Sequence, residues 1–339
     1  MVTTTRTRIA LSASCAAALA LAMPIVEASP ARAADTITAA EQPYFAYYHL
    51  DQARAKGYTG KGVTVAIIDG NVDLSAAELN GAAIANKTPC TVTVTPESTG
   101  HGTGTASILV ARDYGIVPDA TLLAYQTDVG DADPGGDCTG IGGVNLVGYP
   151  SLINHAINDG AQIINLSAGS SDHSSELRWA IARAIHQGVL ITGSAGNEAR
   201  DANNTHLGWW SGVVGVSAVD QNGAFASYSS WGQGVTTAAF GGPVVTREYP
   251  SNAFIQTNGT SSSAPIVAGF LALARQKWPD ATANQLLQLL VHTTVNTDGG
   301  WNQYTGYGLA SPATMINTDP SQYPDENPLA DKGGGTSPT

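Results

Sequence analysis

The sequence has 339 residues, of which 12% are charged and 43% are hydrophobic, and it contains 38 glycines. A chain of this length forms one large domain or two small ones, and the composition is typical of a compact globular protein rather than a disordered one. The formal net charge is −12 and no basic run is present, so nucleic acid and anionic membranes are not expected as main partners.

Residues 1–33 have the pattern of a secretory signal peptide. Arg6 and Arg8 give a positively charged start, residues 9–23 form an Ala- and Leu-rich apolar core, and Ala31-Arg32-Ala33 has the small-x-small pattern of a cleavage site. The apolar core is too short for a comfortable membrane span. We therefore expect a secreted, extracellular protein whose mature chain carries no membrane span.

Two cysteines remain once the signal peptide is removed. Cys15 leaves with the signal, whereas Cys90 and Cys138 both lie in loops rich in Gly, Thr and Pro. An even number of cysteines in an exported protein favours a disulfide, so we predict that Cys90 and Cys138 pair. The alternative is two unrelated free thiols.

The expected mature domain begins with an aromatic-rich stretch over residues 34–60, which we interpret as an N-terminal arm that packs on the core. Residues 63–68, Val-Thr-Val-Ala-Ile-Ile, form the β-branched run typical of a strand buried on both faces of a parallel sheet. The strand ends in the turn Asp69-Gly70-Asn71. Open α/β sheets place ligands and chemistry at such carboxyl ends of strands.

Residues 80–100 have the composition of a loop, and a helix is expected over residues 101–111, His-Gly-Thr-Gly-Thr-Ala-Ser-Ile-Leu-Val-Ala. Its small residues allow close approach to a neighbouring element, and Ile108 and Leu109 give it an apolar face. His101 lies at the beginning of this predicted helix. A structural capping contact is the alternative role for His101.

Strands and helices continue to alternate along the chain. Further strands are expected at residues 120–126, 162–166, 189–192 and 213–218, and further helices at residues 151–159, 174–187, 265–277 and 283–293. Ser151 and either Ser174 or Ser175 are the expected N-caps of two of these helices. Such alternation predicts an α/β fold with a mostly parallel, helix-covered sheet.

The composition changes near the end of the chain. Residues 317–339 are rich in Pro, Asp and Gly and end in Gly-Gly-Gly-Thr-Ser-Pro-Thr, a pattern typical of a disordered tail or linker. We therefore expect a single domain over residues 34–316, with residues 34–60 as its arm.

The stretch Gly259-Thr-Ser-Ser-Ser-Ala-Pro-Ile-Val-Ala-Gly269 joins a Gly-Thr-Ser turn to an apolar helix. Because proline is tolerated in the first turn of a helix, Pro265 predicts a helix start nearby and places Ser261 at or just before it. Free backbone N–H groups and the positive end of the helix dipole then point at Ser261. This suits a nucleophile and the oxyanion that it creates. The alternative role for Ser261 is a helix N-cap.

Asp69, His101 and Ser261 together offer the groups of nucleophilic catalysis. A Ser hydroxyl is a weak nucleophile at neutral pH, so a His must take its proton and a buried carboxylate must orient that His. The order Asp, His, Ser is the subtilisin order among known triads. The Gly-x-Ser-x-Gly motif of the α/β-hydrolases is not matched, because Ser263 occupies its last position. This disfavours an esterase on another α/β fold.

Asn197 is the expected donor to the oxyanion. It follows Gly193-Ser-Ala-Gly196 at the end of a predicted strand, where its amide would point into a cleft. The alternative is a turn Asn with a left-handed backbone.

Four segments in this order resemble the subtilisin-like serine peptidases, the subtilases. They are Val65-Ala-Ile-Ile-Asp69, His101-Gly-Thr-Gly-Thr-Ala106, Gly193-Ser-Ala-Gly-Asn197-Glu198 and Gly259-Thr-Ser261-Ser-Ser-Ala-Pro265. The resemblance spans roughly residues 55–315. It implies an α/β, three-layer subtilisin-like fold with a mostly parallel seven-stranded sheet between helices.

The resemblance also implies roles for individual residues. Ser261 would be the nucleophile, His101 the general base and acid, Asp69 the orienting carboxylate and Asn197 the oxyanion donor. Ser167, Ala168 and Gly169 match the segment that lines the primary specificity pocket. Residues 126–144 match the opposite wall of a groove that binds peptide substrates as an added strand.

The chain departs from the family pattern in two places. Gly70 and Asn71 follow Asp69 where relatives have Ser or Thr and then Gly, so a hydroxyl that would support Asp69 is missing. Asn tolerates the left-handed turn that Gly fills, so the fold is expected to survive.

Only about 30 residues separate the signal from the first core strand. Such a short segment leaves no room for the usual pro-domain. In this respect the chain resembles the mycosin-like actinobacterial branch, in which a short N-terminal arm packs on the catalytic domain.

Calcium is common in the family, and Asp51, Asp73, Asp128, Asp131 and Asp133 offer loop oxygens. Their spacing forms no cage, so we interpret them as solvated acidic residues and predict no metal site, while structural calcium stays open. No cofactor is required for the chemistry.

Taken together, these features predict a secreted, monomeric serine endopeptidase that acts on peptides or proteins. The alternative is a catalytically silent subtilase fold that binds or scaffolds other proteins. Retention of all four catalytic-site residues disfavours it.

Overall fold

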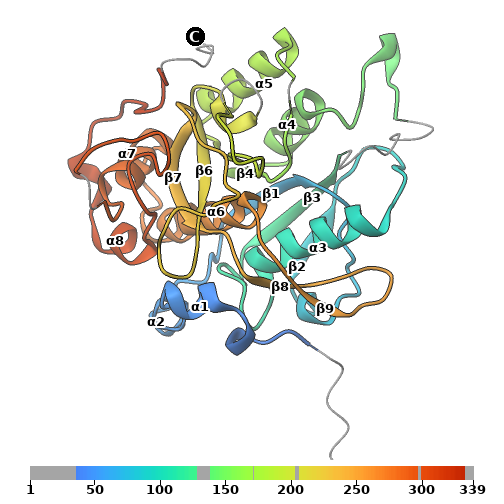
Figure 1. The fold of residues 1–339 in the computed structure, drawn as a ribbon. Helices are drawn as coiled ribbons and strands as arrows, with labels where there is room; N and C mark the ends of the chain where they lie inside the picture. The colour runs from blue at the N-terminus through green and yellow to red at the C-terminus, as the bar shows by residue number, and fades with distance from the viewer. Residues whose placement is uncertain (1–35, 128–137, 171, 203–205, 297–298, 333–339) are drawn as a thin grey trace, which may run out of the picture. The chain divides into compact units, whose positions relative to one another are not determined.

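A seven-stranded, all-parallel sheet forms the centre of the fold (Figure 1). The computed structural model describes residues 36–127, 138–170, 172–202, 206–296 and 299–332, and the expected signal peptide, residues 1–33, lies outside them. The strand order is β2-β3-β1-β4-β5-β6-β7. The bounds are β1 Thr64–Asp69, β2 Ala83–Asn86, β3 Thr121–Gln126, β4 Ile163–Leu166, β5 Leu190–Ser194, β6 Val213–Val219 and β7 Val235–Phe240. The predicted α/β, subtilisin-like architecture is confirmed.

Different helices cover the two faces of the sheet, because side chains alternate along each strand. On β1, Val65 and Ile67 point into a core shared with α3 (Pro96–Val110), α6 (Thr260–Lys277) and α7 (Ala283–His292). Ala66 and Ile68 point into the opposite core, shared with α4 (Tyr149–Asn158) and α5 (Ser175–His186). All of these β1 side chains are fully buried, as the apolar run of a doubly covered strand predicts.

Helix α6 packs along strands β4 to β7 and against α3 and α8 (Pro312–Asn317). It is apolar on almost every side, which is the pattern of a helix buried in a core. Gly269 allows close packing, because a Cβ there would lie 2.7 Å from Cγ2 of Ile116. In the described part of the chain, neither α6 nor any other helix is long and apolar enough to cross a membrane.

The strand order reverses direction at β1. From β1 the chain continues to β2 and β3 on one side of the sheet, and later to β4 and the following strands on the other. The carboxyl ends of β1 and β4 therefore flank a crevice, which is where open α/β sheets bind their ligands. Asp69 ends β1, and Ser167-Ala168-Gly169 follows β4 directly.

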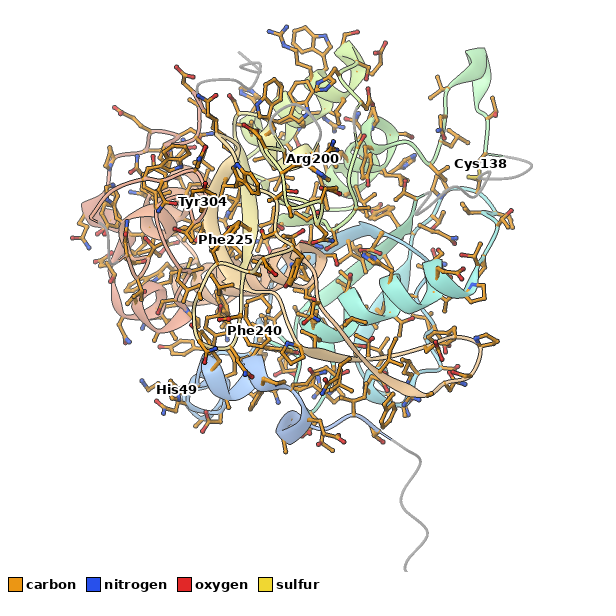
Figure 2. All side chains as sticks on the ribbon, in the orientation of Figure 1. His49, Cys138, Arg200, Phe225, Phe240 and Tyr304 are labelled. Carbon is orange, nitrogen blue, oxygen red and sulfur yellow. A yellow bond between two sulfur atoms is a disulfide. The ribbon has the colours of Figure 1, made fainter. Side chains whose placement is uncertain are left out.

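The N-terminal arm packs on the domain through aromatic residues. It contains the short helices η1 (Ala39–Glu41), α1 (Pro43–Tyr47) and α2 (Leu50–Ala55). Tyr44 is fully buried against Phe240, which lies beside the arm in Figure 2. The hydroxyl oxygen of Tyr48 accepts a hydrogen bond from the backbone N–H of Phe240 at 2.9 Å, so the arm is tied to the end of β7.

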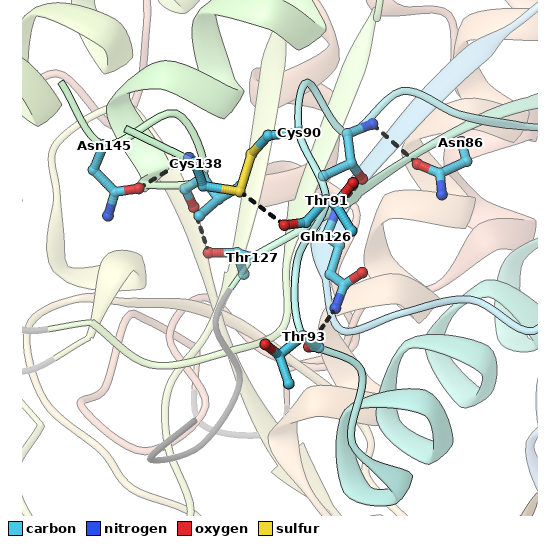
Figure 3. The surroundings of a disulfide bond; sticks show 10 residues. Asn86, Cys90, Thr91, Thr93, Gln126, Thr127, Cys138 and Asn145 are labelled. Atoms are coloured by element: carbon cyan, nitrogen blue, oxygen red, sulfur yellow. Dashed lines mark hydrogen bonds between the residues drawn. A yellow bond between two sulfur atoms is a disulfide. The ribbon is translucent and has the colours of Figure 1, made fainter. Parts of the chain in front are cut away.

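The predicted disulfide is confirmed. Cys90 and Cys138 are joined with their Cα atoms 5.4 Å apart and 48 positions apart in the sequence. The bridge connects the segment after β2 to the segment that precedes α4 (Figure 3). Close by, the Gln126 side chain donates a hydrogen bond to the carbonyl of Thr93 at 3.1 Å. The bridge thus joins two loops, and the one after β2 is also tied to the end of β3.

Helix α3 begins earlier than predicted, and the expected loop over residues 80–100 contains two elements. Thr95 caps α3 by accepting a hydrogen bond from the Ser98 N–H at 3.1 Å, and Pro96 occupies the first turn. His101 therefore lies in the second turn of the helix and not at its beginning. Strand β2 is missed because it has four residues on the sheet edge, none of which is buried.

Two other predicted helix starts are also wrong. Helix α4 begins at Tyr149 with Gly148 as its N-cap, so Ser151 is inside the helix. Helix α6 begins at Thr260, so Pro265 lies in the second turn and Ser261 in the first. The Ser174 cap is confirmed, since its hydroxyl accepts from the Leu177 N–H.

The prediction of a disordered tail from residue 317 is wrong for residues 317–332. The side chain of Leu329 is buried, and its carbonyl accepts a hydrogen bond from the Gly212 N–H at 2.7 Å. The ammonium group of Lys332 donates to the carbonyl oxygens of Gly208 and Val213 at 2.6 and 2.8 Å. Composition alone missed this segment because its partners, such as Gly208 and Val213, are distant in the sequence. Residues 333–339 are outside the described part.

We expect Tyr48→Phe to destabilise the protein by about 1–3 kcal/mol, because the buried N–H of Phe240 would lose its acceptor. The measurement is urea unfolding, made in a Ser261→Ala background to prevent self-digestion. Tyr47→Phe is the matched control, since the Tyr47 side chain is half-exposed, and it should change stability by less than about 0.5 kcal/mol. Equal losses in both variants would contradict this role for the Tyr48 hydroxyl.

Candidate active site

The Asp69 side chain is fully buried at the end of β1. Its Oδ1 atom lies 2.5 Å from Nδ1 of His101 and accepts a hydrogen bond from the Gly70 N–H at 2.6 Å. Its Oδ2 atom accepts from the Thr105 hydroxyl at 3.0 Å. A buried carboxylate is costly unless it is hydrogen-bonded, and these three donors meet that requirement.

His101 reaches Asp69 because helix α3 packs directly on the turn that follows β1. A Cβ at Gly102 would overlap the carbonyl oxygens of Gly70 and Asn71, so only glycine permits this approach. The negative charge of Asp69 raises the pKa of His101 above its ordinary value of 6.5, an effect that outweighs desolvation. The imidazole is 29% exposed, so its outer edge faces the solvent while its inner nitrogen faces the carboxylate.

Ser261 lies half-buried in the first turn of α6, where N–H groups are not needed by the helix ladder. Pro265, four positions later, has no N–H to donate to the Ser261 carbonyl. A Cβ at Gly259 would lie 3.0 Å from Oγ of Ser261 and 3.4 Å from Nδ2 of Asn197. These two polar atoms therefore border the same small space beside Gly259.

The amide of Asn197 has a defined orientation. Its Oδ1 atom accepts hydrogen bonds from the backbone N–H of Thr260 at 2.8 Å and from the Thr260 hydroxyl at 3.0 Å. Because a backbone N–H can only donate, the other amide atom must be the NH₂ group, which faces Gly259. Asn197 does not have a positive φ, which rules out the alternative of a left-handed turn residue.

A cleft of about 750 Å³ brings these groups together. His101, Asn197 and Ser261 line it, together with the segment Ser167-Ala168-Gly169. The Ser167 side chain is buried and accepts a hydrogen bond from the Asn165 amide at 2.7 Å, so it supports the wall from behind. Ala168 and Gly169 are more exposed and face the space where a ligand would lie.

Sequence reasoning missed the wall formed by a β-hairpin, β8 (Val244–Arg247) and β9 (Phe254–Thr257). Thr246, Tyr249 and Ile255 of this segment line the cleft. Two β-branched runs separated by Pro, Ser and Asn are a hairpin signal that could have found it. Of the expected wall at residues 126–144, positions 128–137 lie outside the described residues, and the described positions do not line the cleft.

The hairpin is held in place by two pairs of contacts. The half-buried Arg247 guanidinium donates to both carboxylate oxygens of Glu78, with Nη2–Oε2 at 2.9 Å. The Gln42 side chain of the arm donates to the Val245 carbonyl at 2.8 Å and accepts from its N–H at 3.2 Å. The arm and the segment after β1 thus fix one wall of the cleft.

The described residues contain no group of three or more His, Cys, Asp or Glu side chains positioned to hold a metal ion. Asp73, one of the acidic residues considered for calcium, accepts hydrogen bonds from Ser75 at 2.6 Å and from the Tyr249 hydroxyl at 2.8 Å. Asp128, Asp131 and Asp133 lie outside the described residues.

Known proteins are similar to this chain in sequence. A profile of the subtilase family matches residues 60–308. The thermostable alkaline protease of Halalkalibacterium halodurans is 33% identical over 80% of this chain and 72% of its own length. Subtilisin DY of Bacillus licheniformis is 32% identical over 76% of this chain and 92% of its own length.

Solved structures are similar to it in fold. A crystal structure of MycP1 from the ESX-1 type VII secretion system has a TM-score of 0.71 at 25% identity, covering 88% of this chain and 90% of that one. MycP1 from Mycobacterium smegmatis has a TM-score of 0.68 at 26% identity, covering 87% and 88%. These neighbours agree with the predicted mycosin-like branch. The chain belongs to the subtilase family and is a serine-type endopeptidase.

Proposed function

We propose that this protein is an exported endopeptidase that cleaves peptide bonds through Asp69, His101 and Ser261. The observation that carries the proposal is the short contact between Asp69 and His101, in a cleft that also presents Ser261 and the NH₂ group of Asn197. The disulfide and the signal-like N-terminus support export, because disulfides persist in oxidising compartments.

The contact with Asp69 sets the protonation of His101. When Nδ1 donates its hydrogen to the carboxylate, Nε2 of the neutral imidazole is left as an acceptor. Nε2 then takes the proton of the Ser261 hydroxyl as Oγ forms a bond to the carbonyl carbon of the substrate. Among the described residues, no hydrogen bond joins Ser261 to His101; such contacts tighten when substrate binds.

The tetrahedral intermediate carries a negative charge on the former carbonyl oxygen. The Asn197 NH₂ group and the backbone N–H of Ser261 are the donors for it, since the Thr260 N–H already binds Oδ1 of Asn197. The C–N bond then breaks, and His101 gives its proton to the departing amine. Water, activated by the same His101, hydrolyses the Ser261 ester and regenerates the hydroxyl.

The cleft suits an extended peptide better than a small molecule. Its volume is about 750 Å³, and the half-buried Ala168 and the exposed Gly169 line it together with hairpin residues. Extended peptides bind such edges through main-chain hydrogen bonds, with pockets for alternate side chains. Because the catalytic groups are assembled and accessible, a peptidase fits better than a silent scaffold.

Ser261→Ala should abolish peptide hydrolysis and leave the fold intact, because only the attacking oxygen is removed. Casein hydrolysis and labelling by a fluorophosphonate probe measure this, with circular dichroism as the check on folding. Heat-denatured wild-type protein is the control and should not label. Labelling of the folded Ser261→Ala protein would show that another residue is the nucleophile.

Asn197→Ala should lower kcat by about 100- to 1,000-fold, which is the typical cost of removing one oxyanion donor. Asn197→Asp is the matched variant, since it keeps an acceptor for Thr260 but has no NH₂ group. Both variants should still bind a fluorescent peptide substrate, with KM little changed. Wild-type kcat in Asn197→Asp would contradict the donor role.

His101 should titrate above pH 6.5 in the folded protein, since the charge of Asp69 favours the imidazolium. Only the neutral form accepts the Ser261 proton, so kcat/KM should fall as the pH drops through this pKa. NMR titration of His101 in Ser261→Ala should give a higher midpoint than in Ser261→Ala/Asp69→Asn, where the charge is absent. Identical midpoints would contradict the assigned cause.

A further inference from the structure

We infer that Thr105 is a positioning residue that holds the Asp69 carboxylate in the orientation needed by His101. The inference rests on the triad proposed above and extends it to a residue outside that triad. It concerns the hydrogen bond from the Thr105 hydroxyl to Oδ2 of Asp69, 3.0 Å long and buried.

Thr105 and His101 bind the two oxygens of one carboxylate from one helix. They lie four positions apart on α3, so both side chains are on the same helix face. His101 lies against Oδ1 and Thr105 against Oδ2. The carboxylate therefore bridges two consecutive turns of the helix.

This bridge restricts the rotation of the Asp69 carboxylate about its terminal side-chain torsion, which has a low barrier. The terminal torsion of an Asp side chain has a broad energy minimum, so one bound oxygen does not define the plane of the carboxylate. Oδ1 also accepts from the Gly70 N–H, but Oδ2 accepts only from Thr105 among the described residues. Thr105 thus sets the direction in which Oδ1 meets Nδ1 of His101.

The residue that follows Asp69 has no means of supplying this hydroxyl. Gly70 has no side chain, and a Cβ there would overlap the carbonyl oxygen of Ser98. The sequence departure at Gly70 predicted a missing hydroxyl beside Asp69. The structure instead has a hydroxyl donor, reaching Asp69 from helix α3 rather than from the end of strand β1.

Burial makes the Thr105 contact consequential. Thr105 is 3% exposed and Asp69 is fully buried, so water has little access to replace the hydroxyl. A buried acceptor that loses its donor bears the full cost of desolvation. The carboxylate would then turn toward another donor, and its hydrogen bond to His101 would be misdirected.

The test compares Thr105→Val with Thr105→Ser in the full-length protein. Val has nearly the shape of Thr without the hydroxyl, and Ser keeps the hydroxyl. We expect Thr105→Val to lower kcat roughly tenfold, the effect of losing one hydrogen bond to a charged group, with KM changed less than about twofold. Thr105→Ser should stay within about threefold of wild type.

Thr103→Val is the matched control. It makes the same substitution in the same helix at a buried position, but its hydroxyl accepts from the Asp73 N–H at 2.9 Å instead of contacting Asp69. A kcat loss in Thr105→Val that Thr103→Val does not share supports the inference. An equal loss of kcat in the two variants, or a change in KM without a loss of kcat, would overturn the inference.

A second readout does not depend on activity. In a Ser261→Ala background, the low-field NMR signal of the His101 Nδ1 proton reports its hydrogen bond to Asp69. Thr105→Val should shift or broaden this signal, and Thr105→Ser and Thr103→Val should not. An unchanged signal in Thr105→Val would refute the positioning role. If the protein hydrolyses no peptide but the signal responds as expected, the proposed function fails and the positioning role stands.

Discussion

The close packing of helix α3 on the end of strand β1 is the contact on which the catalytic cleft depends. Glycines make it feasible from both sides, because a Cβ at Gly70 would overlap Ser98 and a Cβ at Gly102 would overlap Gly70 and Asn71. Glycine in a helix costs about 1 kcal/mol relative to alanine. This cost is accepted where the backbone of a helix must touch the turn that carries the buried carboxylate. His101 and Thr105 reach Asp69 only as a result of that contact.

The buried charge of Asp69 links stability to chemistry. Three donors compensate for its desolvation, and one of them is the imidazole that takes part in the proposed reaction. The interactions that make the burial tolerable therefore also orient His101 and raise its pKa. A solvated carboxylate would bind the imidazole more weakly, because water screens the charge.

The second half of the cleft is built around Thr260. Its backbone N–H and hydroxyl bind the Asn197 amide, and its hydroxyl also accepts from the Gly196 N–H at 3.1 Å. The end of β5 and the start of α6 are thereby fixed to each other. The two halves meet because the carboxyl ends of parallel strands lie at one edge of the sheet. The arm supports the hairpin wall through Gln42, so a segment near the N-terminus contributes to the shape of the cleft.

The sequence by itself determined the α/β alternation, the buried strand before Asp69, the Cys90–Cys138 pair and the family. These follow from local signals: β-branched runs, helix caps, cysteine parity and short motifs whose chemistry is specific. It misplaced the starts of α3 and α6, although Thr95-Pro96 is a recognisable helix start. It also missed the edge strand β2, whose four residues carry too little periodicity.

Only the tertiary structure decided the contacts between residues distant in the sequence. The hairpin wall depends on Glu78 and Gln42, and the order of residues 317–332 depends on carbonyl oxygens at Gly208 and Val213. The role inferred for Thr105 is of the same kind. A threonine one helical turn after His101 is unremarkable in sequence, because no local pattern records that a carboxylate 36 positions earlier lies within reach of its hydroxyl. That distance is set by how closely α3 packs on β1, which is a property of the folded backbone.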